Sequence, residues 1–395
     1  MKKTQHTAIS RYFLLLIGLL VVLPQLISCS TYDTVRVITS RDPGKALEQT
    51  AKNRVHSYKH NPFVLAKDVR RLINTLKGNV DREWGKKNRQ LPSSHRFVKY
   101  TQNYKSRAII GFDSGNIRIE TVADKRPFIS LHNAIVTTLL TPDDPRSVDL
   151  YTDHVVELKG KPYLAGFVKN EHGTYINNVS RASRYADYLL KHKLKQKKIK
   201  AGKKTRSVRS VNFKMVSNHA NIRARRYAGL VNQFARRYQL NKSLVYAIIK
   251  TESNFNPYAT SAAPAYGLMQ LVPTSGGRDA FKFVKGKDHI PSRQYLFNAK
   301  NNIELGTGYL NIINTRYLKN IHNPLSREYC VIAAYNTGSG NVLRAFHKNR
   351  DRAIRIINRM PPAQVYQHLR KKLKYHEARR YLWKVTHAQR QFVRL

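Results

Sequence analysis

The chain has 395 residues, of which 72 are Lys or Arg and 23 are Asp or Glu, so its formal net charge is +49. Hydrophobic residues make up 41% of the chain, which is enough for one or two buried cores, and we expect two domains. The only cysteines, Cys29 and Cys330, exclude a disulfide framework and argue against a structural zinc site.

The excess of positive charge favours an anionic partner, through long-range attraction and the release of counterions. Nucleic acid, anionic lipid and the carboxylates of a cell wall all fit this description. A general drift of composition towards basic residues, without a function, is the alternative, because Lys and Arg are scattered through every segment. The charge alone therefore does not select a partner.

The first 28 residues have the pattern of a secretory signal, with basic residues ahead of a short apolar run over 12–23. Spanning a membrane takes about 20 predominantly apolar residues, so a simple transmembrane anchor is the weaker interpretation. Shortly after the run the sequence reads Leu26-Ile27-Ser28-Cys29, which resembles the bacterial lipobox. This resemblance implies that Cys29 is lipidated and becomes the first residue of the mature chain. Ser30, by resemblance to lipoprotein sorting rules, implies the outer membrane and a periplasmic location, which argues against nucleic acid as the partner.

The next part of the chain predicts a tether and then a small domain. Residues 29–60 are polar and irregular and suit a tether, and apolar residues at helical spacing follow from Val69 to Val80. Residues 108–112 and 116–122 alternate apolar and polar around an Asp-Ser-Gly turn, which predicts a β-hairpin.

A helix with Leu131, Ile135 and Leu139 on one face follows the hairpin, and the apolar run over 163–168 could add a strand. Residues 61–190 are therefore predicted to form a small α+β domain. No constellation of catalytic residues stands out in it.

Residues 191–206 form a basic, glycine-containing run, which we interpret as a linker; contact with an anionic wall or lipid is the other interpretation. From Asn221 onward the apolar residues recur at helical spacing almost throughout. Pro361-Pro362 separates a last helical region. Residues 207–395 are predicted to be an all-α domain.

One carboxylate, Glu252, is predicted to project from the apolar stripe of a helix that Ser243 caps and that starts at Leu244. Ile248 and Ile249 lie about 40° and about 60° from Glu252 around the helix axis. A carboxylate among apolar groups is disfavoured as the anion, so its pKa rises towards neutrality and it can deliver a proton. The alternative is a Glu that turns to solvent or pairs with a lysine.

Glu252 has no carboxylate neighbour in the sequence. Asp187 is the previous acidic residue and Asp279 is the next, although Asp279, Glu304 or Glu328 could approach in three dimensions. Glycosidases with paired carboxylates need a second one at a fixed separation. A lone buried Glu suits another mechanism, in which it protonates a glycosidic oxygen, the N-acetyl group of the substrate stabilises the anomeric centre, and the same Glu then acts as base.

Several motifs carry a family resemblance. Glu252-Ser253-Asn254-Phe255-Asn256-Pro257 matches E-S-x-F-x-P, Ala265 to Gln270 matches A-x-G-L-M-Q, and Ala334 to Gly340 matches A-Y-N-x-G-x-G, in that order. Glu377 to Tyr381 is similar to a closing E-[ST]-x-x-Y helix, with Ala378 in place of Ser or Thr. These motifs resemble those of the goose-lysozyme-like lytic transglycosylases. The lipobox, Phe112 to Gly115 and Thr141 to Pro145 resemble a membrane-bound branch of that family.

The resemblance implies a multidomain protein, in which the small α+β domain precedes an all-α, lysozyme-like catalytic domain of the goose type. It implies that Glu252 is the acid and base. The substrate-binding residues that it implies are Ser253 near the reacting sugar, Gly267, Leu268, Met269 and Gln270 in one groove wall, with Gln270 at the N-acetylmuramyl residue, and Tyr335 and Asn336 at the acetamido group. We expect Met269 to pack rather than react, the motif glycines to serve backbone geometry, and Cys330 to be a buried free thiol.

The implied reaction is nonhydrolytic cleavage of the β-1,4 bond between N-acetylmuramic acid and N-acetylglucosamine in peptidoglycan, which leaves 1,6-anhydromuramyl ends and needs no cofactor or catalytic metal. Two alternatives stay open: a muramidase, in which water captures the same intermediate, and a noncatalytic lipoprotein that binds the wall. The expected partners are glycan strands and, through Cys29, outer-membrane lipid. No nucleic-acid-binding module is visible in the sequence, and protein partners and the role of residues 61–190 stay open.

Overall fold

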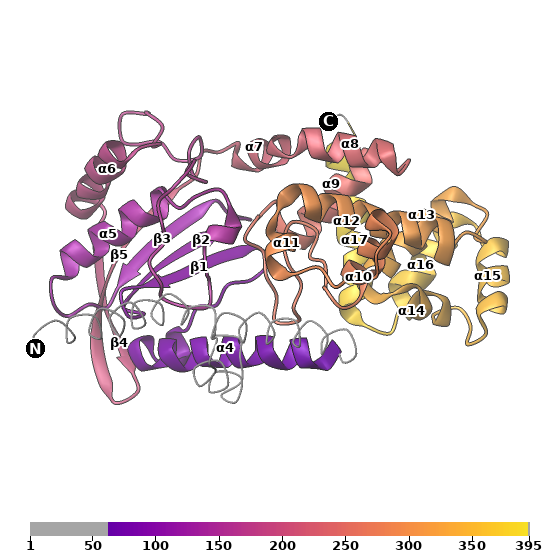
Figure 1. Ribbon diagram of the computed structural model, residues 1–395, viewed down its shortest axis with the longest axis horizontal. Coiled ribbons are helices and arrows are strands. Elements are labelled where there is room, and N and C mark those ends of the chain that lie inside the picture. Colours follow the sequence, from indigo (N-terminus) through magenta and orange to yellow (C-terminus); the bar gives the residue numbers. More distant parts are fainter. Residues whose placement is uncertain (1–61, 394–395) are drawn as a thin grey trace, which may run out of the picture. The chain divides into compact units, whose positions relative to one another are not determined.

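The computed structural model describes residues 62–393 (Figure 1), so the predicted signal, the lipidated Cys29 and the tether lie outside the described residues. The chain divides into two units between Leu76 and Lys77, inside helix α4, and apart from the part of α4 up to Leu76 everything described below belongs to the second unit. Within residues 62–393, no helix combines the length and the apolar character needed to cross a membrane.

The first half of the described chain is an α+β arrangement around one antiparallel sheet. Its strands lie in the order β1-β2-β3-β5-β4, and α5 packs on β2 and β3 and also against α6. The elements are α4 (Pro62–Trp84), η2 (Lys86–Asn88), β1 (Arg96–Thr101), β2 (Ser106–Gly111), β3 (Asn116–Thr121), α5 (Pro127–Leu139), η3 (Pro145–Ser147), α6 (Val179–His192), β4 (Lys195–Ala201) and β5 (Lys204–Lys214).

The sequence predicted part of this arrangement correctly. The hairpin is confirmed as β2 and β3, which pair Ile110 with Ile117 around a turn at Gly115, where φ is +69°. The helix after it is confirmed as α5, whose residues Leu131, Ile135 and Leu139 are buried. The helix predicted around Val80 is confirmed as α4.

The predicted linker over 191–206 is wrong, because this run forms the end of α6 and most of the β4–β5 hairpin, with Gly202 in its turn at φ +62°. Strand β4 lies at the sheet edge and exposes all its side chains except Ile199 and Ala201. Lysines on such an edge discourage pairing with another chain, so a basic run is compatible with a strand as well as with a linker. The sheet continues to Lys214, beyond the predicted end of the α+β domain.

Two further differences concern strands. Residues 163–168 form successive turns around Gly166 rather than a strand, although Leu164 and Phe167 are buried there. Strand β1 was not predicted from the sequence: it begins with Arg96, ends with Thr101 and has four buried residues between them, one of which is Lys99. Both segments are short and contain buried apolar residues, so their sequence pattern does not show which of the two pairs in the sheet.

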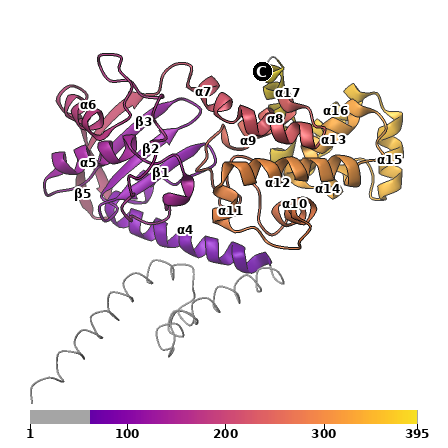
Figure 2. The same ribbon diagram turned by 45° about the horizontal axis from the view of Figure 1, so that its top comes forward.

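The second half is helical from α7 on, which confirms the all-α prediction for that part, and Figure 2 shows these helices from another side. The elements are α7 (His219–Arg226), α8 (Ala228–Arg237), α9 (Lys242–Ser253), α10 (Gly276–Lys285), α11 (Arg293–Phe297), α12 (Ala299–Ile312), η4 (Ile313–Tyr317), α13 (Pro324–Thr337), α14 (Ser339–Arg344), α15 (Arg350–Arg359), α16 (Pro362–Lys372), α17 (His376–Gln389) and η5 (Arg390–Phe392).

Helix α9 lies in the core of this helical part. Every residue from Ser243 to Ile249 is buried, and the helix packs against α8 and α17. Its N-cap is Asn241, whose Oδ1 accepts hydrogen bonds from the Ser243 N–H and hydroxyl, so the prediction of Ser243 as the cap is wrong by two residues. Cys330 is a free, buried thiol as predicted, and burial raises its pKa to about 12.

Candidate active site

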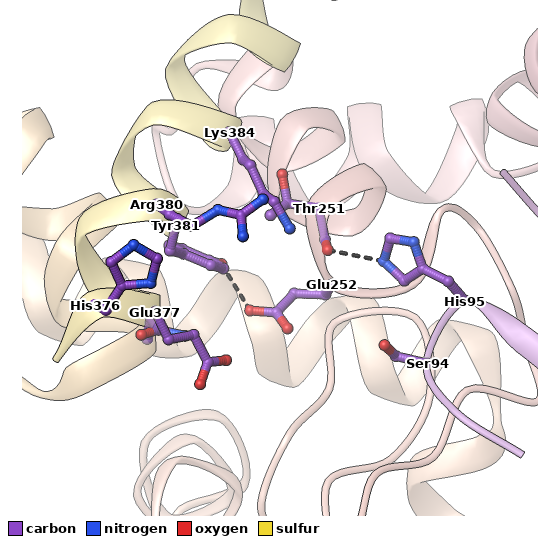
Figure 3. A pocket seen from close by; sticks show the side chains of 10 residues that line it. Ser94, His95, Thr251, Glu252, His376, Glu377, Arg380, Tyr381 and Lys384 are labelled. Atoms are coloured by element: carbon purple, nitrogen blue, oxygen red, sulfur yellow. Dashed lines mark hydrogen bonds between the residues drawn. The ribbon is translucent and has the colours of Figure 1, made fainter. Parts of the chain in front are cut away.

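Glu252 lies in the last turn of α9 and opens onto a cleft of about 400 Å³ (Figure 3). The cleft is lined by Ser94, His95, Thr251, Glu252, Asn336, His376, Glu377, Arg380, Tyr381 and Lys384. These residues come from four places in the sequence: the segment before β1, the end of α9, the end of α13, and α17. The side chain predicted to project from the buried stripe therefore does reach a solvent-connected cavity.

Burial raises the pKa of Glu252 to about 7, and the hydrogen bond from Tyr381 and the charge of His95 oppose that rise without cancelling it. The residue as a whole is only half-buried, because one side faces the cleft. Apolar α9 neighbours such as Ile248 and Ile249, both fully buried, remove water from the other side. At neutral pH this carboxyl therefore holds a proton for a large part of the time.

Tyr381 fixes the orientation of the Glu252 carboxyl. Its hydroxyl donates a hydrogen bond of 2.6 Å to Glu252 Oε1 (Figure 3). Burial raises the pKa of Tyr381 well above its usual value, and the neighbouring Glu252 charge acts in the same direction, so the phenol stays protonated and remains a donor. With Oε1 engaged, Oε2 is the oxygen that is free to carry the acidic proton.

A second carboxylate, Glu377, lines the same cleft from the first turn of α17 and is exposed. Its charge adds to the rise in the Glu252 pKa. The three acidic residues considered from the sequence lie elsewhere: Glu304 pairs with Arg237 and Lys285, Asp279 accepts from Tyr317, and Glu328 accepts from Gln389. The second carboxylate of the cleft, Glu377, thus lies 125 residues after Glu252 in the chain.

The α+β half contributes His95 to the cleft, and both ring nitrogens of His95 face acceptors. Nε2 lies 3.0 Å from the carbonyl oxygen of Thr251, and Nδ1 lies 2.9 Å from Oδ1 of Asp113. A carbonyl and a carboxylate can only accept, so each nitrogen carries a proton and the ring is an imidazolium. Burial by itself would lower the pKa of His95, but the hydrogen bond and charge of Asp113 outweigh it and the pKa is raised.

Two asparagines of the motif that begins at Glu252 hold the end of α9 against the α+β half. Asn254 is the C-cap at φ +47°, and its Nδ2 donates to the Phe112 carbonyl oxygen at 3.0 Å and to Asp113 Oδ1 at 2.9 Å. Asn256, fully buried, donates through Nδ2 to the Ser94 carbonyl oxygen at 2.9 Å. Because Asn tolerates the left-handed conformation, Asn254 both ends the helix and makes the hydrogen bonds to Phe112 and Asp113.

The loop that carries the second motif, residues 265–270, is hydrogen-bonded to α9 and α12. The Ser253 hydroxyl contacts the Leu268 carbonyl oxygen at 2.7 Å, and Asn302 Oδ1 accepts from the Met269 N–H at 2.8 Å. Gly267 has φ +75°, and a Cβ there would lie 2.4 Å from Asn302 Nδ2, so both space and backbone conformation require glycine. The Tyr335 hydroxyl donates to the Met269 carbonyl oxygen at 2.8 Å.

The substrate-binding residues implied by the family resemblance fall into two groups. Ser253, Leu268 and Met269 are buried to 1% exposure or less, so their side chains cannot touch a sugar in this structure, and the expectation for Ser253 is corrected. Its hydroxyl is used to position the loop instead. Gly267 is also buried, whereas Gln270, Tyr335 and Asn336 are half-buried, and of these residues Asn336 lines the cleft.

Sequence reasoning missed the groups that surround Glu252. Tyr381 and Glu377 were quoted only as parts of a closing helix, although their spacing of four residues places both on one helix face. His95 has no recognisable motif around it, and only the Asp113 that it contacts was noted, as part of the predicted hairpin turn. A residue from another domain has no signal at a fixed sequence distance from Glu252.

Comparison with known proteins shows two matching families along the chain. Residues 59–226 match "Membrane-bound lytic murein transglycosylase C, N-terminal domain", and residues 229–358 match "Transglycosylase SLT domain". The boundary between them falls where the structure changes from the sheet and α7 to α8.

Relatives match over nearly their full length. A membrane-bound lytic murein transglycosylase C from Mannheimia succiniciproducens is 45% identical over 82% of this chain and 88% of the relative. The Salmonella arizonae protein of the same name is 41% identical over 96% of this chain and 99% of the relative. Among solved structures, lytic transglycosylase Slt from Pseudomonas aeruginosa is 24% identical over 41% of this chain and 23% of its own, with a TM-score of 0.33.

Replacing Tyr381 by Phe is expected to raise the pKa of the Glu252 carboxyl further above its usual range, because the hydrogen bond from Tyr381 favours the ionised form. Carbon-13 NMR titration of the Glu252 carboxyl measures this directly. Tyr329→Phe, which removes a hydroxyl outside the cleft lining, is the matched control and should leave the titration unchanged. An unaltered or lowered pKa in Tyr381→Phe would show that the phenol does not stabilise the carboxylate.

Proposed function

The chain belongs to the membrane-bound lytic murein transglycosylase C family, and we propose that Glu252 acts as both acid and base in its cleavage of peptidoglycan. The enzyme is a lytic transglycosylase whose substrate is the peptidoglycan strand. The observation that supports the role of Glu252 best is its carboxyl group, with a pKa of about 7, held by Tyr381 at the wall of an open cleft.

Glu252 begins the reaction as the acid. Its protonated Oε2 donates to the glycosidic oxygen between N-acetylmuramic acid and N-acetylglucosamine, and the bond from that oxygen to the muramyl C1 breaks. The positive charge that develops at C1 is stabilised by the carbonyl oxygen of the muramyl N-acetyl group, so no enzyme carboxylate has to bond to the sugar. A pKa of about 7 suits this step because the acid is then neither fully ionised nor too weak to release its proton.

Glu252 ends the reaction as the base. The carboxylate left by the first step takes the proton from the C6 hydroxyl of the same muramyl residue, and the C6 oxygen bonds to C1. The product is a 1,6-anhydromuramyl end, and Glu252 is again protonated. No water enters, so the atoms of the two product strands equal those of the substrate.

The remaining residues are proposed to hold the sugar. Asn336, half-buried at the end of α13, faces the cleft and is suited to a hydrogen bond with the acetamido group. Gln270 and Tyr335 are proposed to act beside it, Gln270 towards the muramyl residue and Tyr335 by holding the Met269 carbonyl oxygen. Gly267, Leu268 and Met269 are proposed to shape the wall through their backbone, since their side chains are buried.

Hydrolysis of the same bond is the second candidate reaction. The observation that favours it is the position of Glu377 in the cleft. This exposed carboxylate lines the cleft and could activate a water for attack on C1. The products separate the two reactions, because a hydrolase leaves free reducing ends that are one water heavier than anhydro ends.

Membrane association follows from the family, and we propose a specific anchor for it. Residues 1–28 would be removed as a signal, Cys29 would carry the lipid, and residues 29–60 would tether the enzyme to the outer membrane on its periplasmic side. The support in the sequence is the short apolar run over 12–23, which is followed by Leu26-Ile27-Ser28-Cys29. A cysteine that carries several acyl chains holds a protein stably on a bilayer, whereas a single acyl chain binds only weakly and reversibly.

Glu252→Gln is expected to abolish strand cleavage while leaving the fold intact, because the amide cannot deliver a proton but has nearly the same shape. Purified sacculi are digested with the full chain or the variant, and the released sugars are analysed by mass spectrometry. Anhydro-muropeptides from the parent and none from the variant support the proposal. Reducing ends would identify a muramidase, cleavage by the variant would remove Glu252 from the mechanism, and binding without products from either protein would indicate a wall-binding lipoprotein.

The rate should fall as pH rises through about 7, because the protonated form of Glu252 is the active one in bond cleavage. In His95→Gln the loss of a nearby positive charge raises the Glu252 pKa, so this alkaline limb should move to higher pH. The profile of kcat/KM against pH measures the shift, with Lys319→Gln, which alters an exposed lysine outside the cleft, as the control. A limb that stays in place in His95→Gln, or moves equally in both variants, contradicts this coupling.

Cys29→Ala is expected to leave the enzyme unanchored, because the lipid has no other attachment point. Fractionation of cells that express the parent or the variant measures how much protein sediments with the outer membrane. Most of the variant should appear in the soluble fraction with its activity on isolated strands retained. Membrane sedimentation of both proteins in equal amounts would refute Cys29 as the anchor.

A further inference from the structure

A second cleft of about 310 Å³ adjoins the catalytic one. It is lined by His95, Asp113, Lys250, Thr251, Asn254, Trp383, Lys384, His387, Ala388 and Gln391. Three of these residues, His95, Thr251 and Lys384, also line the catalytic cleft, so the two cavities share a wall. We call the second cavity the flanking cleft. A ligand group bound there would lie directly beside a sugar at Glu252.

The flanking cleft is positively charged. Lys250 and Lys384 face it, and within residues 62–393 neither has a carboxylate at salt-bridge distance. Asp113 is the acidic residue of the lining, but its charge is engaged by the His95 imidazolium and the Asn254 amide. The field that remains attracts an anion.

Lys250 indicates that this attraction is not satisfied inside the protein. Its ammonium donates to Gln391 Oε1, a neutral acceptor, and lies 5.7 Å from the centre of the Phe392 ring. Burial, reinforced by the charge of Arg223, lowers the pKa of Lys250. A half-buried cation without a counterion gains more from an arriving carboxylate than a solvated surface lysine does.

An exposed aromatic surface completes the flanking cleft. Trp383 is 47% exposed and stacks on His387, with ring centres 5.2 Å apart and planes at 15°. Both residues project from the α17 face that also carries Lys384. A flat indole that stacks on another ring offers contact area to a ligand at little entropic cost.

We propose that the flanking cleft binds the carboxylate-bearing peptide that branches from the muramyl residue of the strand being cleaved. This inference rests on the proposed function, because the cleft is defined relative to a muramyl sugar at Glu252. The peptide leaves that sugar through its lactyl group, close to the bond that breaks, and carries free carboxylates. Lys250 and Lys384 would pair with these carboxylates, and Trp383 would pack against the peptide backbone. The enzyme would thereby favour strands that still bear peptides over bare ones.

The high net charge of the chain makes a matched control necessary, since any basic surface attracts an anion weakly. Lys319 is exposed between η4 and α13 and lines neither cleft. Lys319→Gln removes the same charge as Lys384→Gln without altering the flanking cleft. Loss of binding in both variants alike would mean general attraction rather than a site.

Binding is measured in the full chain carrying Glu252→Gln, so that the result does not depend on turnover. The ligands are glycan fragments with their peptides and the same fragments after amidase removal of the peptides. Tryptophan fluorescence reports on the site because the chain has two tryptophans and the other, Trp84, is fully buried. Calorimetry gives the affinities, and circular dichroism checks that each variant is folded.

The peptide-bearing fragment is expected to bind about tenfold more tightly than the bare one, because the bare fragment cannot form a charge-assisted hydrogen bond with the lysines. It is also expected to quench the fluorescence of Trp383. Lys250→Gln with Lys384→Gln should remove most of this advantage, Trp383→Leu should reduce it, and Lys319→Gln should preserve it. Rising salt should weaken it. Equal affinity for the two fragments, or an advantage that survives the double variant, overturns the proposal. Bare fragments that still bind Glu252→Gln would leave the proposed reaction intact in that case.

Discussion

The structure depends on the removal of water from one face of the Glu252 carboxyl group. Helix α9 is buried from Ser243 to Ile249, and that burial removes water from the side of its last turn that faces the core. A carboxylate in such a place would be strongly disfavoured, and Tyr381 and the His95 charge limit the effect so that the pKa stops at about 7. The balance of these opposing terms, rather than any single one, produces a group that can give and then take a proton at neutral pH.

The α+β half is part of this balance as well as a neighbouring domain. His95 and Asp113 lie on it, yet they contact the backbone of Thr251 and the side chain of Asn254 at the end of α9. The hydrogen bond from Asn256 to the Ser94 carbonyl oxygen adds a second attachment. Movement of this half away from α9 would therefore remove a charge from the catalytic cleft and free the residues that follow Glu252, which gives residues 77–214 a role in the chemistry that their own sequence does not suggest.

The positive charge of the chain is distributed differently over the sheet edge and the clefts. Much of it is spread over exposed faces, such as the lysines of the edge strand β4, where it has no specific ligand in view. In the flanking cleft, by contrast, Lys250 of α9 and Lys384 of α17 line one cavity, and its acidic residue, Asp113, is bonded to His95 and Asn254. The basic residues of the flanking cleft thus differ from those of β4 in lining a defined cavity.

The motifs around Glu252, Gly267 and Tyr335 were sufficient to predict the family, the helical catalytic half and the shifted carboxyl, because each depends on short-range spacing along one helix or loop. Periodicity also located α4, α5 and the β2–β3 hairpin correctly. It failed for residues 191–206, since an exposed edge strand rich in lysine has the composition of a linker. The partners of Glu252 were decided only by tertiary structure: Tyr381 lies 129 residues away in the chain and His95 lies 156 residues from the carbonyl oxygen of Thr251 that it contacts. Likewise, Ser253 was known to be next to Glu252, but successive helix residues point in different directions, and only the packing of the 267–270 loop shows that its hydroxyl faces inward.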